Sequence, residues 1–164
     1  MLRIIGAGMI IFSGSMLGFL KSDSLKKRVD SLGKIISGLN LLETDISYGK
    51  KNLKSALLTI GKHHDIPLFK NAAQKIDEKG IKKALDMALE SEGSYLLKQD
   101  KAPLIALGEN LGMTDTASQV TSIRRAVSAL CEGKKEAENE YARLGRLYRS
   151  CGVLGGILGA IILI

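Results

Sequence analysis

The sequence has no tryptophan, two prolines and two cysteines, and its 164 residues include only seven aromatic side chains, four tyrosines and three phenylalanines. Because so few aromatic side chains could stack on bases and no nucleic-acid-reading motif is present, the net charge of +7 is weak evidence of nucleic-acid binding. Cys131 and Cys151 lie twenty positions apart without a C-x-x-C pair. We therefore predict neither a disulfide framework nor a zinc site, and expect both cysteines to pack as small apolar residues.

Acidic residues are absent from both ends of the chain. All 17 lie between Asp23 and Glu140, while residues 4–20 and 150–164 form uncharged runs of 17 and 15 residues. In a helix that rises about 1.5 Å per residue, these runs span roughly 25 and 22 Å, short of a hydrocarbon core of roughly 30 Å. Tyr148 and Arg149 can lengthen the second run because both side chains suit the membrane interface. We expect transmembrane helices at residues 1–20 and 150–164.

Two other interpretations of these runs are open. Apolar runs of this length also occur as buried helices of a helical bundle. The first run follows Arg3 and could be a cleaved signal peptide, although it lacks a clear small-x-small exit. A signal peptide would also leave the second run unexplained.

Basic residues stand at the inner edge of each run. Lys21 follows the first run, and Arg143, Arg146 and Arg149 precede the second. Basic residues close to spanning segments stay in the cytoplasm, so these four residues are predicted membrane-edge cations. Residues 21–149 would then form a cytoplasmic domain, with both termini on the opposite side of the membrane.

The middle of the chain predicts helices. The first would be capped near Ser22 and continue to about Tyr48, because apolar residues recur at spacings of three and four. Asn52 can cap the second helix, and Pro67 suits the first turn of a third helix that Gly80 would close.

The last third of the chain predicts one long helix. From about Asp115 no proline occurs, and apolar residues recur at mostly helical intervals into the terminal run. No stretch shows sustained period-two alternation, so no sheet is predicted. The expected fold is all-α: a cytoplasmic bundle of about six helices flanked by N-terminal and C-terminal transmembrane helices.

Residues suited to catalysis are few. His63, His64 and Asp65 form the one cluster that could bind a metal or move protons, but adjacent histidines on a helix point about 100° apart. A solvated turn before Pro67 explains the cluster better, because a metal site needs three or four convergent ligands. The Gly-Lys pairs lack the spacing of a phosphate loop. We predict no catalytic, metal or cofactor site.

Glycine spacing is more informative. Pairs of glycines four residues apart lie on one face of a helix, and they let two helix backbones approach closely inside a membrane. We predict that such pairs pack the terminal helices together, and that Gly156→Leu would disrupt this packing. The alternative is that glycine is simply common in membrane helices. The residues concerned are Gly14, Gly18, Gly152, Gly155, Gly156 and Gly159.

Three stretches carry a resemblance to a known family. They are LLETDISYG at residues 41–49, LGENLGMTD at residues 107–115 and LYRSCGVLGG at residues 147–156. In their order and spacing they resemble the stage III sporulation protein AB family. The resemblance extends over essentially the whole chain, including its length and its apolar ends.

The resemblance implies a function in endospore-forming bacteria. Members of that family belong with the components of a channel complex between the mother cell and the forespore, and their helical part is similar to the F family of secretion and pilus platform proteins. It implies a non-catalytic platform on the mother-cell side of the outer forespore membrane that couples a secretion-type ATPase to the channel. Secretion platforms carry two such helical domains and usually three spans, whereas this chain has room for one domain and two spans.

The partners implied are therefore an ATPase, ring-forming membrane proteins, the lipid bilayer and a second copy of the chain. No nucleic acid and no cofactor is implied. Two alternative functions stay open: a holin-like or other small membrane protein unrelated to secretion, and a membrane-anchored enzyme that uses His63 and His64.

Overall fold

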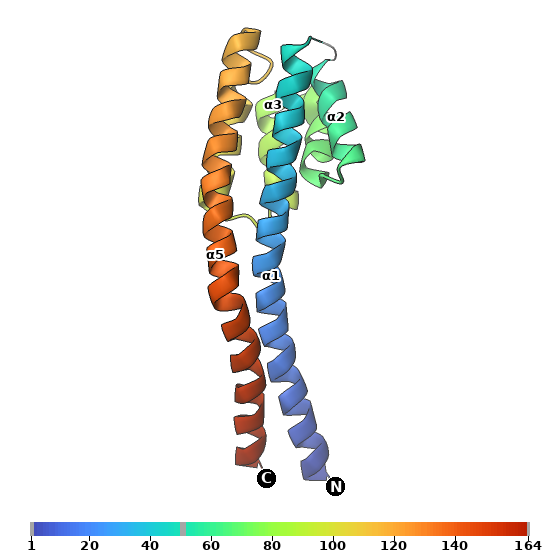
Figure 1. The fold of residues 1–164 in the computed structure, drawn as a ribbon. Helices are drawn as coiled ribbons and strands as arrows, with labels where there is room; N and C mark the ends of the chain where they lie inside the picture. The colour runs from blue at the N-terminus through green and yellow to red at the C-terminus, as the bar shows by residue number, and fades with distance from the viewer. Residues whose placement is uncertain (1, 50–51, 164) are drawn as a thin grey trace. The chain divides into compact units, whose positions relative to one another are not determined.

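The computed structural model describes residues 2–49 and 52–163, which form five helices without a strand among them (Figure 1). The prediction of an all-helical chain without a sheet is confirmed. The expected number of about six becomes five, since the segments on either side of Gly80 belong to one kinked helix. The helices are α1 (Leu2–Ser47), α2 (Leu53–His63), α3 (Pro67–Glu92), α4 (Lys98–Asn110) and α5 (Thr116–Leu163).

The predicted transmembrane helices are not supported. Over residues 2–49 and 52–163, no helix combines the length and the apolar character needed to cross a bilayer. The prediction of spans at residues 1–20 and 150–164 is therefore wrong for the part of the chain that is described; Met1 and Ile164 lie outside it. The physical reason is that each uncharged run is shorter than the roughly 20 apolar residues of a span, and glycine and serine occupy part of each.

The first helix has no break after the N-terminal run. Ser22, expected to be near the N-cap of a new helix, lies inside α1 with 1% of its surface exposed. An N-cap residue has non-helical backbone angles, and here the helix continues from Leu2 to Ser47. The cap signal in the sequence was therefore misleading.

Other boundary signals in the sequence agree with the structure, except that Gly80 kinks a helix and does not end one. The Asn52 side chain accepts a hydrogen bond from the Lys54 amide at 3.2 Å and so caps α2. Pro67 is the first residue of α3, where its missing N–H costs nothing. Gly80 interrupts α3 with φ 74° and ψ 163°, a conformation that favours glycine. The long last helix begins at Thr116, one residue after the predicted boundary at about Asp115.

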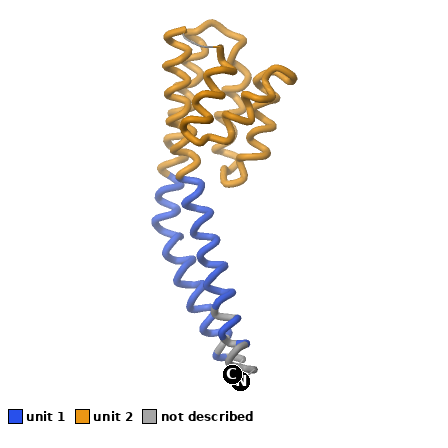
Figure 2. The backbone as a smooth tube through the Cα atoms, turned by 90° about the vertical axis from the view of Figure 1, so that its right-hand side faces the viewer, with its two compact units in different colours: residues 1–29, 136–164 blue, residues 30–135 orange. Residues whose placement is uncertain are grey.

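The chain divides into two compact units, which are described separately (Figure 2). Residues 30–135 form the bundle unit, which contains α2, α3, α4 and parts of α1 and α5. Residues 1–29 and 136–164 form the helix-pair unit, which contains the remaining parts of α1 and α5.

The bundle unit has a core of large apolar side chains. Phe69, Leu104 and Ile123 are each at most 1% exposed. Gly38 makes room for the Phe69 ring, because a Cβ on Gly38 would lie 2.5 Å from Phe69 Cε2. Ion pairs on the surface of this unit join residues of different helices or, for Asp65, a helix and the turn after α2, each with a contribution of at most about 1 kcal/mol. They are Lys34–Asp65, Lys54–Asp77, Lys82–Glu109 and Arg124–Glu43.

Candidate functional site: the glycine seam of the helix-pair unit

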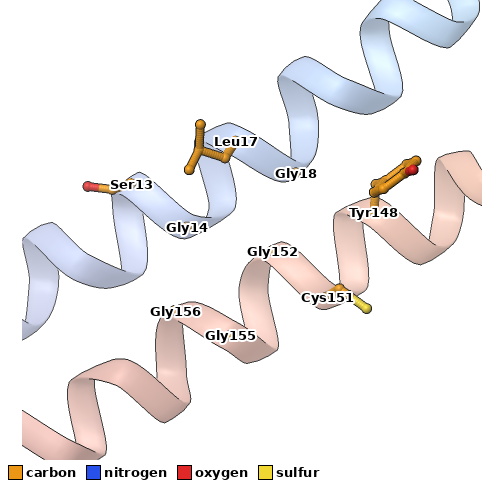
Figure 3. A pocket seen from close by; sticks show the side chains of 9 residues that line it. All are labelled: Ser13, Gly14, Leu17, Gly18, Tyr148, Cys151, Gly152, Gly155 and Gly156. Carbon is orange, nitrogen blue, oxygen red and sulfur yellow. The ribbon is translucent and has the colours of Figure 1, made fainter.

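The two helices of the helix-pair unit meet at glycine residues. Figure 3 shows Gly14 and Gly18 of α1 opposite Gly152 and Gly156 of α5. Gly14 lies near Gly156 and Gly18 near Gly152, so the two helices run antiparallel. We call these four residues the glycine seam.

The seam leaves no room for side chains. A Cβ built on Gly14 would lie 2.9 Å from the Gly152 carbonyl oxygen, and one built on Gly152 would lie 2.7 Å from the Gly14 carbonyl oxygen. A Cβ on Gly18 would overlap the Tyr148 carbonyl oxygen. Because these neighbours are backbone atoms, any substitution must move one helix away from the other. The seam therefore sets the distance between the two helices.

An open groove of about 580 Å³ runs along the seam. Besides the seam glycines it is lined by Ser13, Leu17, Tyr148, Cys151 and Gly155 (Figure 3). Leu17 is 68% exposed and Cys151 is also exposed, so accessible side chains border the groove.

The six glycines named from the sequence do not all lie in the seam. Gly14, Gly18, Gly152 and Gly156 come together, with Gly18 and Gly156 buried. A Cβ on Gly155 would meet nothing within 4 Å, and Gly159 is half-buried. The structure thus separates four contact glycines from Gly155, while the role of the six in packing within a membrane stays a prediction.

Next to the glycine seam, polar contacts join residues that follow Gly18 to residues that precede Gly152. Ser22, four residues after Gly18, accepts a hydrogen bond at 2.9 Å from Arg149 Nε, and Arg149 Nη2 donates to the Tyr141 hydroxyl at 3.1 Å. Arg149 is one of the predicted membrane-edge cations, and that role stays a prediction. In the structure its guanidinium is hydrogen-bonded to two side chains of the helix-pair unit.

A partly buried ion pair joins the same two helices. Arg28 Nη1 donates to Glu140 Oε2 at 3.0 Å, and only 5% of the Arg28 side chain is exposed against 40% of that of Glu140. A buried guanidinium needs such a partner, because an unpaired charge in a protein interior is costly. This pair joins residues 112 positions apart. The other predicted membrane-edge cations, Lys21, Arg143 and Arg146, are exposed.

From the sequence, Ser22 was expected near an N-cap and Glu140 was expected to pair with Arg143 on its own helix, so neither contact between the two helices was predicted. For Ser22 a signal existed, since Gly14, Gly18 and Ser22 are small residues spaced by four and continue one helix face. A Cβ on Gly145 would lie 3.3 Å from Ser22 Oγ, so α5 also presents a small residue at this level. For Glu140 no local pattern points to a partner in the first helix.

The histidine pair lies elsewhere, at the end of α2. His63 is the last residue of α2 and His64 is its C-cap, and both are exposed. The neighbouring Asp65 forms an ion pair of 2.9 Å with Lys34. Among residues 2–49 and 52–163, no three His, Cys, Asp or Glu side chains converge as metal ligands do.

The structure thus shows a helical protein in which two long helices, joined by a glycine seam, also contribute to a separate helical bundle. The sequence belongs to a defined family of this class. Residues 3–164 match the family model described as stage III sporulation protein AB, so the chain is a member of that family.

Two known proteins are similar to this chain. Stage III sporulation protein AB of Bacillus subtilis (strain 168) is 28% identical over 172 aligned residues, which cover 96% of each chain. A solved structure of a stage III sporulation protein AB has a TM-score of 0.63 and 26% sequence identity, and the match covers 70% of this chain and 96% of that chain. The resemblance drawn from the three sequence stretches is confirmed.

Proposed function

We propose that this protein is a non-catalytic platform component of the mother cell–forespore channel complex, where it couples a secretion-type ATPase to the channel during endospore development. The observation that carries the proposal is the family match over residues 3–164, which makes the chain a sporulation protein. The assignment to a channel and an ATPase goes further and depends on the likeness of the family to secretion platforms.

The geometry supports a scaffold role. The helix-pair unit is organised around backbone contact between two helices rather than around reactive side chains. The bundle unit presents ion-paired, accessible surfaces suited to protein contacts. His63 and His64, the residues on which an enzyme would depend, are adjacent and exposed at the end of a helix.

The proposal includes ring-forming proteins and a second copy of the chain as partners. Twelve of the 18 large apolar side chains exposed in the described part of the chain lie in the helix-pair unit, which supports contacts with apolar partner surfaces. The most exposed of them are Phe12 at 72%, Leu17 at 68% and Met9 at 67%. Contact with a lipid bilayer stays a prediction from the sequence.

Affinity purification from sporulating cells tests the proposal. The full chain, tagged and expressed in an endospore-forming bacterium that lacks its own copy, is purified in detergent from sporulating and from vegetative cells. We expect an ATPase of the secretion type and ring-forming membrane proteins to co-purify from sporulating cells only, and spore formation to be restored. Purification of the chain without either class of partner would contradict the platform role.

A histidine variant separates the platform from an enzyme. His63→Ala with His64→Ala should restore spore formation as well as the unaltered chain and retain the same partners, because neither side chain is buried. Loss of spores with partners retained would favour an enzyme that uses these histidines.

A further inference from the structure

The bundle unit carries a second groove, far in sequence from the glycine seam. It has a volume of about 660 Å³ and is formed by the start of α2, the kink of α3 and the segment that follows α4. We call it the lysine groove. All its lining residues belong to the bundle unit.

The floor of the lysine groove is apolar. Leu111 and Ile81 are buried at its base, with 2% and 9% of their surfaces exposed, and Leu53 is half-buried beside them. Met113 also lines the groove and is 80% exposed, the highest value among the exposed large apolar side chains. A flexible methionine at the edge of an apolar groove adapts to the surface of a partner.

The rim of the groove is strongly basic. Glu109 is the single carboxylate among the thirteen residues that line it. The acids nearest in sequence to the kink, Asp77 and Glu78, are not lining residues. Four lysines do line it: Lys54, Lys79, Lys82 and Lys83.

Two of these lysines have no acidic partner among the residues that the structure describes. Lys54 is held in an ion pair, and Lys82 contacts Glu109 at 2.8 Å. The hydrogen bond and charge of Glu109 raise the pKa of Lys82, and the same contact lowers the pKa of Glu109. Lys79 and Lys83 form no ion pair with any described residue. In the described part of the chain, the groove therefore keeps two lysines outside any ion pair beside an apolar floor.

Two glycines give the groove its shape. Gly80 has φ 74° and Gly112 has φ 75°, values that L side chains rarely adopt. A Cβ on Gly80 would meet nothing within 4 Å, so the backbone conformation alone demands glycine there. Lys79 and Ile81 are the neighbours of this non-helical glycine, and both line the groove.

We propose that the lysine groove binds an acidic amphipathic segment of a partner protein. Apolar side chains of that segment pack on Met113 and Leu53, and its carboxylates pair with Lys79 and Lys83. An apolar floor without arginine or an aromatic ring fits such a peptide better than a nucleic acid, which is recognised by stacking and by phosphate contacts. A binding site of this kind goes beyond the proposed platform function, because it specifies where a partner binds and by what chemistry.

Photo-crosslinking in sporulating cells tests this surface. The full chain carries p-benzoylphenylalanine in place of Met113, and a matched control carries it in place of Ile105, which is 40% exposed and does not line the groove. The proposal predicts a cross-link from position 113 to a segment rich in Asp and Glu with apolar residues at helical spacing, identified by mass spectrometry. Position 105 should not give this cross-link.

Charge reversal then tests the lysines. Lys79→Glu with Lys83→Glu should reduce the yield of the cross-link by roughly tenfold, equivalent to about 1.4 kcal/mol of binding. Lys70→Glu with Lys98→Glu, two exposed lysines outside the groove, should leave the yield unchanged. Basic substitutions in the partner segment should restore the yield with the first pair. Circular dichroism of each purified variant verifies that it is folded.

Several outcomes would overturn the proposal. They are a cross-link to a second copy of this chain, to lipid, to nucleic acid or to a segment poor in acids, no cross-link at all, and a yield that does not respond to reversal of Lys79 and Lys83. These outcomes are independent of the purification experiment, since an ATPase could co-purify through a different surface.

Discussion

The bundle unit and the helix-pair unit bury different kinds of side chain. Of the 25 buried apolar side chains in the described part of the chain, 24 lie in the bundle unit, and Ala137 alone lies in the helix-pair unit. Conversely, twelve of the 18 exposed large apolar side chains lie in the helix-pair unit. The bundle unit thus has the ordinary core of a globular domain, while the helix-pair unit turns its large apolar side chains outward.

This difference shows that the two units are stabilised in different ways. Full burial of one leucine or phenylalanine contributes about 1.5–3 kcal/mol, and the bundle unit contains many such residues. The helix-pair unit depends on close backbone contact at the glycine seam and on hydrogen-bonded charges. Its outward apolar side chains are numerous enough to mark an interaction surface.

A substitution in the bundle core sharpens this comparison most strongly. Leu104 is fully buried in α4 and its neighbour Ile105 is 40% exposed. We expect Leu104→Ala to lower the free energy of unfolding of the bundle unit by about 2–5 kcal/mol, because it removes buried atoms and leaves a cavity. Ile105→Ala, the matched control, should cost less than about 1 kcal/mol. Urea unfolding of the full chain, followed by circular dichroism, measures both; equal losses would show that α4 is not packed as described.

The buried ion pair provides the next largest effect, in the helix-pair unit. Glu140→Ala removes an ion-pair partner of a guanidinium whose side chain is 5% exposed, and should destabilise this unit by about 1–3 kcal/mol. Glu140→Gln retains a hydrogen-bond acceptor and should lose less. Arg143→Ala, at an exposed position three residues further along the same helix, is the control and should be nearly neutral.

A double substitution tests whether the pair is needed as a charge pair. Arg28→Leu combined with Glu140→Leu removes both charges of this pair at once. We expect the double variant to be more stable than Glu140→Ala, because apolar replacement of a buried pair is often nearly neutral. Thermal unfolding of the purified full chain in detergent ranks the variants. A double variant that is as unstable as the single one would assign the loss to packing instead.

Alanine at two neighbouring glycines should have opposite effects. At Gly155 the new methyl group meets nothing within 4 Å, so Gly155→Ala should stabilise α5 by about 0.5–1 kcal/mol through helix propensity. At Gly152 the same methyl group would lie 2.7 Å from the Gly14 carbonyl oxygen, so Gly152→Ala should push the helices apart. Double electron–electron resonance between spin labels attached to cysteines introduced at Ser13 and Tyr148, with Cys131 and Cys151 replaced by serine, measures the separation. The same label separation in both alanine variants would contradict the seam.

Local signals in the sequence predicted much of the fold. Asn52, Pro67 and Asp115 mark helix boundaries through rules that involve only a few neighbouring residues, and each agrees with the structure, while Gly80 marks a kink within α3. Ser22 misled because the same hydroxyl that can cap a helix can also accept a hydrogen bond from Arg149 inside one. A capping signal does not say whether a helix starts or continues.

The features that sequence did not reveal are non-local. The Arg28–Glu140 pair joins residues 112 positions apart, and nothing near either residue specifies the other. The lysine groove combines the start of α2, the kink of α3 and the segment that follows α4, so the charges of Lys54 and Lys79 could not be assigned to one surface beforehand. The glycine spacing predicted a contact face, but only the structure distinguishes Gly152, which touches the other helix, from Gly155, which does not.

The start of α5 offers the smallest effect, and one that depends on pH. Asp115 Oδ2 accepts a hydrogen bond from the Ser118 amide at 3.1 Å, and the contacts with Ser118 lower the pKa of the Asp115 carboxyl below its ordinary value of 3.8. Because the pKa of Asp115 is lower in the folded state than in the unfolded state, its charged carboxyl stabilises the folded chain fully above pH 3.8. This stabilisation is lost as the pH falls from there through the folded-state pKa.

Substitution of Asp115 separates its charge from its function as a cap. Asp115→Asn keeps a good N-cap, so stability at pH 7 should change little, while the loss of stability below pH 3.8 should become shallower. Asp115→Ala should lower stability at pH 7 and show the same shallow acid dependence. Unfolding by urea at a series of pH values between 2 and 7 measures both effects. Because the Asp115 carboxyl is exposed, the change in stability should be small compared with that of Leu104→Ala. If stability falls as steeply with acid in Asp115→Asn as in the unaltered chain, the contact with Ser118 does not favour the charged form of the Asp115 carboxyl.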